Sequence, residues 1–108
     1  MRDEPAGSDY DCAMQPTETP EDRELAWLGD AALAIVAREW ILEVRGCLDG
    51  EILRRITSNQ FLRSFGHPTK VEAELGILYR EGGVDAVRKR FLAVMVPKYR
   101  ELYGLRKG

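Results

Sequence analysis

The sequence predicts an all-α fold, and three features support this prediction. Apolar residues recur every three or four positions in several segments, which is the spacing of one face of an α-helix. No segment alternates apolar and polar residues with the period of two that a half-buried strand needs. The chain has 108 residues, 44% of them hydrophobic, which is enough for one core. We therefore expect one helical domain at residues 21–104, a flexible acidic tail at 1–20 and a short tail at 105–108.

The first predicted helix begins near Pro20 and extends to about Val44. Thr19 is a suitable N-cap, Pro20 fits the first turn, and the acidic residues that follow complement the helix dipole. Gly46 is the expected C-terminal stop. The predicted apolar face consists of Leu25, Leu28, Ala32, Ile35, Val36 and Trp40.

The second predicted helix follows Asp49 and ends near Phe65–Gly66. Ser58 and Asn59 lie within it, and both side chains compete for backbone hydrogen bonds, so we expect a kink or a break there. His67–Pro68 then forms a short joint, because the residue before a proline avoids the helical region.

Two more helices complete the predicted domain. The third extends from about Thr69 to Arg80, and Gly82–Gly83 is expected to stop it. The fourth extends from Val84 to about Leu102. Pro97 is expected to kink this last helix, because proline lacks the amide hydrogen that a helix interior needs.

Acidic residues are concentrated near the N-terminus. The chain has 16 basic and 18 acidic residues, a net charge of -2, which disfavours nucleic-acid binding through overall charge alone. From Leu25 onward, 14 basic residues stand against 10 acidic ones. Residues 1–20 combine acidic residues with Pro, Gly, Ser and Thr and show no apolar periodicity, as in a flexible tail. Any contact with RNA must therefore be local.

Two other classes of protein are disfavoured. Cys12 and Cys47 lack CxxC spacing, so we do not expect a disulfide or zinc framework. The sequence has no apolar stretch of the length that spans a membrane, and its acidic N-terminus is unlike a signal peptide. These features predict no membrane partner and a location in the cytoplasm or in the interior of an organelle.

Asp30 is the one charged residue in the apolar segment from Leu25 to Ala37. An ionised carboxylate is rarely left in apolar surroundings unless it is paired, hydrogen-bonded or bound to a metal. Gly29 weakens a helix by about 1 kcal/mol relative to alanine, so we expect another backbone or a ligand to come close at this point. Glu72 and Gly76 repeat this arrangement, one helical turn apart on the same face.

These acid–glycine pairs predict a site between two helices. Small residues let helices approach closely, so the carboxylates of Asp30 and Glu72 can converge. Converging carboxylates suit Mg²⁺, which takes oxygen ligands and often needs only one or two from the protein. The alternative is structural, because either acid could cap a neighbouring helix or pair with a buried arginine.

Other polar and aromatic residues have simpler interpretations. Dipole complementation explains Glu51 in the first turn of the second helix, and turn chemistry explains His67. Basic residues on a helix usually form its solvated face, but they are the available contacts for RNA phosphate. These candidate RNA contacts are Arg54, Arg55, Arg63 and Lys70. The residues predicted to lie in the core or an interface are Trp27, Trp40, Tyr79 and Tyr99.

Two segments resemble conserved helices of the ribonuclease III domain family. Residues 25–33, Leu-Ala-Trp-Leu-Gly-Asp-Ala-Ala-Leu, resemble its signature helix. Residues 71–79, Val-Glu-Ala-Glu-Leu-Gly-Ile-Leu-Tyr, followed by Glu81-Gly82-Gly83, resemble its second conserved helix. The resemblance extends over about Glu21 to Leu102 and is closest to the Mini-III branch, which lacks a double-stranded-RNA-binding domain.

The resemblance implies a ribonuclease III-like endonuclease domain, a helical bundle that forms a homodimer through the signature helices. It implies Mg²⁺-dependent (or Mn²⁺-dependent) hydrolysis of double-stranded or structured RNA, such as a ribosomal RNA precursor. Asp30 and Glu72 match the catalytic, metal-binding acids, and Glu51 is the candidate for an auxiliary acid. Trp27 and the alanine-rich face of the first helix are expected to be covered in a two-fold dimer.

The sequence departs from the larger ribonuclease III enzymes in two respects. Arg23, Ala26 and Thr69 stand where those enzymes carry further acids, as in the Mini-III branch. The connection at Gly66–Pro68 lacks the additional helix and basic residues of the family. Two further interpretations stay open: a degenerate, non-catalytic domain that acts as an RNA- or ribosome-associated structural dimer, and a helical interaction module unconnected with RNA.

Overall fold

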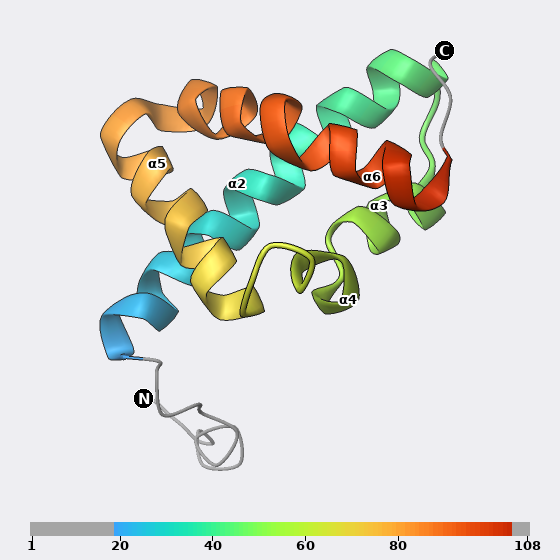
Figure 1. Cartoon of the computed structure of the whole chain (residues 1–108). Helices are drawn as coiled ribbons and strands as arrows, with labels where there is room; N and C mark the ends of the chain where they lie inside the picture. The colour runs from blue at the N-terminus through green and yellow to red at the C-terminus, as the bar shows by residue number, and fades with distance from the viewer. Residues whose placement is uncertain (1–18, 105–108) are drawn as a thin grey trace.

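The computed structural model describes residues 19–104, and the regular structure in that range is entirely helical. In chain order the elements are α2 (Pro20–Arg45), α3 (Gly50–Ile56), α4 (Asn59–Leu62), α5 (Pro68–Arg90), the π-helix η1 (Phe91–Met95) and α6 (Val96–Tyr103). Figure 1 shows the long helices α2 and α5 crossing, with η1 crossing the middle of α2 and α6 continuing from η1. The predicted all-α class is confirmed. Of the predicted tails at 1–20 and 105–108, only Thr19 and Pro20 are among the described residues, and they belong to the start of α2, as its N-cap and its first residue.

Local chemistry determines both ends of α2, as predicted. The Thr19 side chain accepts a hydrogen bond from the Asp22 amide, and the Asp22 carboxylate accepts one from the Thr19 amide, which makes a capping box. Gly46 ends the helix with φ 75°, and its amide donates to the Leu42 carbonyl. Ile35, which we predicted on the buried face, is exposed. Ile35 shares its side of α2 with the exposed residues Ala31 and Arg38, four positions before it and three after it, and this side faces away from the core.

The break predicted at Ser58 separates α3 from α4. The Ser58 hydroxyl donates to the Arg55 carbonyl and accepts from the Phe61 amide, so its side chain replaces a helical hydrogen bond. His67 is the N-cap of α5, and its Nδ1 accepts from the Thr69 amide. The interpretation of His67 as a turn residue is therefore confirmed.

The second half of the chain follows the prediction at Gly83 and differs from it at Pro97. Gly83 has non-helical angles (φ 72°, ψ -166°), so the helix breaks there as predicted, and α5 consists of two helices that meet at this kink. The irregularity expected at Pro97 appears just before it as the π-helix η1, and Pro97 itself lies in the first turn of α6. Proline is tolerated in a first turn, where its missing amide hydrogen has no helical partner.

An aromatic core joins α2 to η1 and α6. The Trp40 ring packs edge-on against Phe91 and Tyr99, with centroids 5.8 and 6.1 Å apart. Trp40 and Tyr99 are thus core residues, as expected, whereas Trp27 and Tyr79 are exposed on the single chain. Within residues 19–104 no helix is both long enough and apolar enough to cross a membrane.

Candidate functional site

The helices α2 and α5 meet at two glycines. A Cβ atom added to Gly29 would overlap the carbonyl oxygen of Glu72 and lie 2.8 Å from the amide nitrogen of Gly76. A Cβ atom added to Gly76 would overlap the carbonyl oxygen of Leu25 and lie 2.7 Å from its carbonyl carbon. Neither position can hold another residue unless the helices move apart. The two backbones are therefore in direct contact, as the small residues predicted.

This contact brings Asp30 and Glu72 together. Asp30 is exposed on α2, and Glu72 is half-buried on α5. Burial, the negative charge of Asp30 and a hydrogen bond to Asp30 together raise the pKa of Glu72 to about 7. Glu72 therefore keeps its proton to a higher pH than an ordinary glutamate does.

The chemistry of this pair fits a divalent cation. Two carboxyl groups of like charge face each other, and a cation between them would remove the repulsion that helps to raise the pKa of Glu72. No group of three or more His, Cys, Asp or Glu side chains suited to a metal occurs among the described residues. Two carboxylates are enough for Mg²⁺, which keeps water and substrate oxygens as its other ligands.

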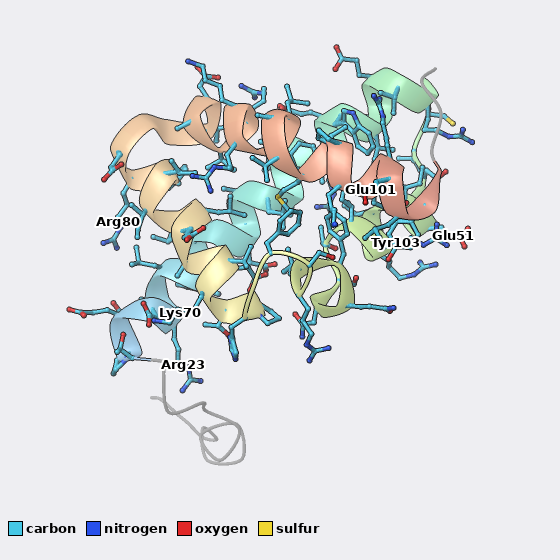
Figure 2. All side chains as sticks on the ribbon, in the orientation of Figure 1. Arg23, Glu51, Lys70, Arg80, Glu101 and Tyr103 are labelled. Atoms are coloured by element: carbon cyan, nitrogen blue, oxygen red, sulfur yellow. The ribbon has the colours of Figure 1, made fainter. Side chains whose placement is uncertain are left out.

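Glu51, the predicted auxiliary acid, lies apart from this pair. Its carboxylate is 3.4 Å from Nη2 of Arg55, one helical turn away on α3. Figure 2 shows Glu51 on the opposite side of the molecule from Lys70, which is close in sequence to Glu72. Dipole complementation and this ion pair explain Glu51, and an auxiliary role stays a prediction.

Two of the four predicted RNA contacts have partners within the chain. Lys70 donates to Asp22 at 2.7 Å, which ties α5 to the start of α2 and lowers the pKa of Asp22. Arg55 pairs with Glu51 and lies over the Tyr103 ring, 4.9 Å from its centroid.

The other two predicted contacts, Arg54 and Arg63, are exposed. Neither has an ion-pair partner in the part of the chain that the structure describes. They are therefore the candidates that remain available to phosphate.

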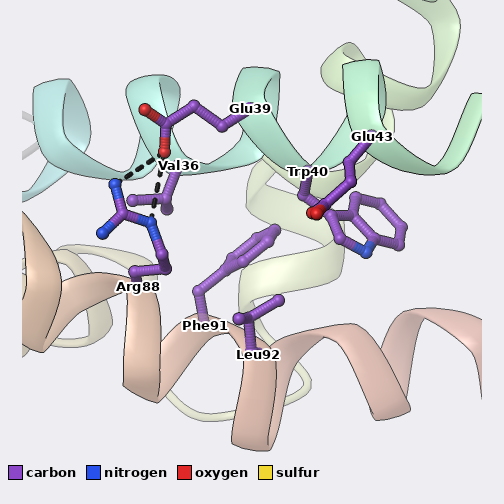
Figure 3. Close-up of a pocket in the computed structure, with 7 residues that line it drawn as sticks. All are labelled: Val36, Glu39, Trp40, Glu43, Arg88, Phe91 and Leu92. Carbon is purple, nitrogen blue, oxygen red and sulfur yellow. Dashed lines mark hydrogen bonds and ion pairs between the residues drawn. The ribbon is translucent and has the colours of Figure 1, made fainter. Parts of the chain in front are cut away.

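Sequence reasoning missed Arg88, which joins α2 to the part of α5 beyond the kink. Its Nε and Nη2 donate to Glu39 at 3.2 and 2.8 Å, and it also pairs with Asp85. Figure 3 shows this pair at a pocket of about 430 Å³ that Trp40 also lines. Arg88 lies beyond the helix break that the sequence predicted at Gly83, on the segment that returns to α2. The pocket lies about nine residues along α2 from Asp30, so it is separate from the carboxylate pair.

Comparisons of the chain with protein-family models, with curated proteins and with solved structures found no match. The resemblance to ribonuclease III therefore stays an interpretation of two short motifs. A functional assignment depends on the residues and on the geometry described above.

Proposed function

We propose that the protein is a Mg²⁺-dependent endoribonuclease of the ribonuclease III type, similar to the Mini-III branch, which acts on double-stranded or structured RNA as a homodimer. The observation that supports this most strongly is the meeting of Asp30 and Glu72 at the contact of Gly29 with α5. Repulsion between two carboxylates opposes folding, and such strained pairs are concentrated at functional sites. The two motifs that contain these acids also occur in the same order as the conserved helices of the ribonuclease III family that they resemble.

The two acids have different tasks in this proposal. Asp30 is exposed and open to substrate, whereas Glu72 is half-buried and anchored by its own backbone against Gly29. Both would hold the ion, which supplies an activated water and neutralises charge that develops at phosphorus. The proton that Glu72 holds near pH 7 must leave before its carboxylate can act as a ligand.

Arg54 and Arg63 are the proposed RNA contacts. Both are exposed, and the described residues offer neither an ion-pair partner. Arginine binds phosphate with two parallel hydrogen bonds and releases counterions, so binding should weaken as salt rises. The choice of RNA as substrate comes from the resemblance alone.

A cleavage assay tests the proposal. The full chain is incubated with end-labelled duplex RNA in Mg²⁺ or EDTA, and a single-stranded RNA of the same sequence serves as the substrate control. We expect Mg²⁺-dependent cuts in the duplex, abolished in Asp30→Asn and in Glu72→Gln. Glu74→Gln is the matched control, because Glu74 is an exposed acid two residues from Glu72. Cleavage by Asp30→Asn, or cleavage by the wild type in the presence of EDTA, would overturn the assignment.

A non-catalytic, RNA- or ribosome-associated dimer is the second candidate. It is favoured by the small donor set in residues 19–104 and by the internal partners of Arg55 and Lys70. Duplex binding without cleavage at saturating Mg²⁺ would select it. A chain with no affinity for RNA would instead be a helical interaction module.

A further inference from the structure

The pocket beside Arg88 has an apolar lining that belongs to the core. It lies between α2 and the start of η1 (Figure 3). Val36, Trp40 and Phe91 line it and are all buried, whereas Leu92, also in the lining, is 46% exposed. Its volume of about 430 Å³ is within the usual range for small-molecule sites. Because core residues form this lining, the pocket is present before any ligand arrives.

The charged residues of the pocket leave an excess of negative charge. Arg88 pairs with both Glu39 and Asp85, so two carboxylates already neutralise its guanidinium. Glu43 also lines the pocket, one helical turn after Glu39. Among residues 19–104 no cation forms an ion pair with Glu43. The pocket therefore favours a cationic ligand over an anionic one.

Glu39 also keeps a hydrogen-bond acceptor for a ligand. Nε and Nη2 of Arg88 both donate to the same carboxylate oxygen, Oε1 of Glu39. The other oxygen, Oε2, is open to a further donor, and the Glu39 side chain is 53% exposed. Residues four positions apart are neighbours on a helix surface, so Oε2 of Glu39 and the carboxylate of Glu43 can serve one ligand group.

We propose that this pocket binds a small primary amine. Its ammonium group lies between Glu39 and Glu43, and its apolar stem packs on Trp40 and Leu92. An ammonium group has three donors and no acceptor, which suits two carboxylates that are one turn apart. Hydrogen bonds between ionised partners are roughly twice as strong as neutral ones. The site is distinct from the carboxylate pair of Asp30 and Glu72 and does not depend on the proposed activity.

The contacts of Trp40 assign the two ends of the ligand. The guanidinium carbon of Arg100 lies 5.9 Å from the centroid of the Trp40 ring, and Arg100 does not line the pocket. The ring therefore already has a cation beside it. The ammonium group is assigned to the carboxylates for this reason, and the Trp40 ring is left to the apolar stem.

The lining disfavours a metal ion or a protein segment as the occupant. Mg²⁺ keeps several waters as ligands, and the apolar side chains of Val36, Phe91 and Leu92 offer it no oxygen. Charged residues are depleted at the centre of protein interfaces, but three of them line this pocket. A small organic cation uses both the carboxylates and the apolar wall.

A titration of the full chain with hexylammonium tests the site. The readout is the NMR signal of each indole N–H group. We expect a saturable shift of the Trp40 signal and none of the Trp27 signal, because Trp27 lies 13 residues earlier on α2, about 20 Å away. Equal shifts of both signals, or none at saturating amine, would overturn the proposal.

Related compounds separate the charge from the stem. Hexanol and hexanoate keep the stem without the positive charge, and we expect each to bind at least about tenfold more weakly than hexylammonium. Methylammonium keeps the charge without the stem and should weaken by a similar factor. Hexanoate that binds as tightly as hexylammonium would refute the assignment of a cationic ligand.

Two variants with matched controls locate the contacts. Glu43→Gln should raise the dissociation constant of hexylammonium about tenfold, whereas Glu81→Gln, at an exposed acid of α5 outside the lining, should change it less than about threefold. Leu92→Ala should raise it about threefold to tenfold. Val94→Ala is the control for Leu92→Ala, since Val94 is also exposed on η1 but lies outside this lining. Controls as damaging as their partners would overturn the contacts.

A lysine side chain is the other source of a primary ammonium group. We expect a five-residue peptide with a central lysine to bind more weakly than hexylammonium, because its backbone would meet the charged rim. Binding about tenfold tighter than hexylammonium would overturn the assignment to a small molecule.

These titrations contain neither RNA nor Mg²⁺, so their result is independent of the cleavage assay. Amine binding by a chain that does not cleave RNA would support this site and refute the enzyme. RNA cleavage by a chain that binds no amine would refute this site and leave the proposed activity standing.

Discussion

Replacing Asp30 by asparagine should stabilise the metal-free protein at neutral pH. Asparagine keeps nearly the same shape but carries no charge, so it removes the repulsion that Glu72 meets on ionising. The opposite result is expected if Asp30 is structural. An Asp30 that capped a helix or paired with an arginine would lose a favourable partner, and the variant would melt lower.

The size of the effect follows from the pKa of Glu72, which is about 7 instead of its ordinary 4.5. A difference of this size corresponds to roughly 3 kcal/mol without solvent screening. Burial is its largest cause and is unchanged in the variant, and Asp30 is exposed, so its charge is screened. We therefore expect Asp30→Asn to add about 1 kcal/mol, or about 4–8 °C in melting temperature for a domain of this size.

The dependence on pH has a definite sign. Folded Glu72 keeps its proton to a higher pH than the unfolded chain does, so this residue lowers the stability of the wild type as pH rises from about 4.5 to about 7. The advantage of Asp30→Asn should be full above pH 7. It should shrink toward zero as pH falls to about 4.5, where Glu72 of the wild type is protonated.

Thermal melts with and without Mg²⁺ provide the assay. An ion bound only by the folded wild type adds about 2.7 kcal/mol at one hundred times its dissociation constant. The order of the melting temperatures should therefore reverse on adding Mg²⁺, with Asp30→Asn higher without the ion and the wild type higher with it. Glu74→Gln should follow the wild type in both conditions. The two-carboxylate site would be refuted if Asp30→Asn had a lower melting temperature than the wild type without metal and Mg²⁺ did not change the melting temperature of the wild type.

Three further outcomes are expected. Gly29→Ala should destabilise the fold by about 3 kcal/mol in urea denaturation and abolish the Mg²⁺ response, because its Cβ would overlap the carbonyl oxygen of Glu72. Gly50→Ala, whose Cβ would meet only a side-chain atom at 3.9 Å, should stay within about 0.5 kcal/mol of the wild type. In filter binding, Arg54→Glu should weaken duplex RNA binding and reduce the salt slope by about one. Arg55→Glu should lower the melting temperature even without RNA, because its guanidinium lies over the Tyr103 ring.

Features that depend on neighbours in sequence could be predicted. The ends of α2 follow from Thr19 and Gly46, whose hydrogen bonds reach only three or four residues along the chain. The break at Ser58 follows in the same way from its own hydroxyl. Each of these signals is complete within about one helical turn, so it can be recognised without knowing the tertiary packing.

Features that depend on residues distant in the sequence could not be predicted. Lys70 and Arg55 both fit the pattern of a solvated basic face, yet Lys70 binds Asp22, 48 residues away, and Arg55 packs on Tyr103 from the last helix. The periodicity of a helix indicates which of its faces is polar. It does not indicate which residues of that face another element will cover.

The candidate site lies between these two cases, which explains why part of it could be predicted. Gly29 and Gly76 are unfavourable within their own helices, so each indicates a close contact without naming the partner. Only the tertiary structure shows that the two glycines belong to the same contact. That contact is made by backbone atoms. Backbone atoms have no rotamers, so the separation of the helices at Asp30 and Glu72 is fixed more tightly than side-chain packing would fix it. A residue added at either glycine should therefore disturb metal binding more than a core truncation of equal effect on stability.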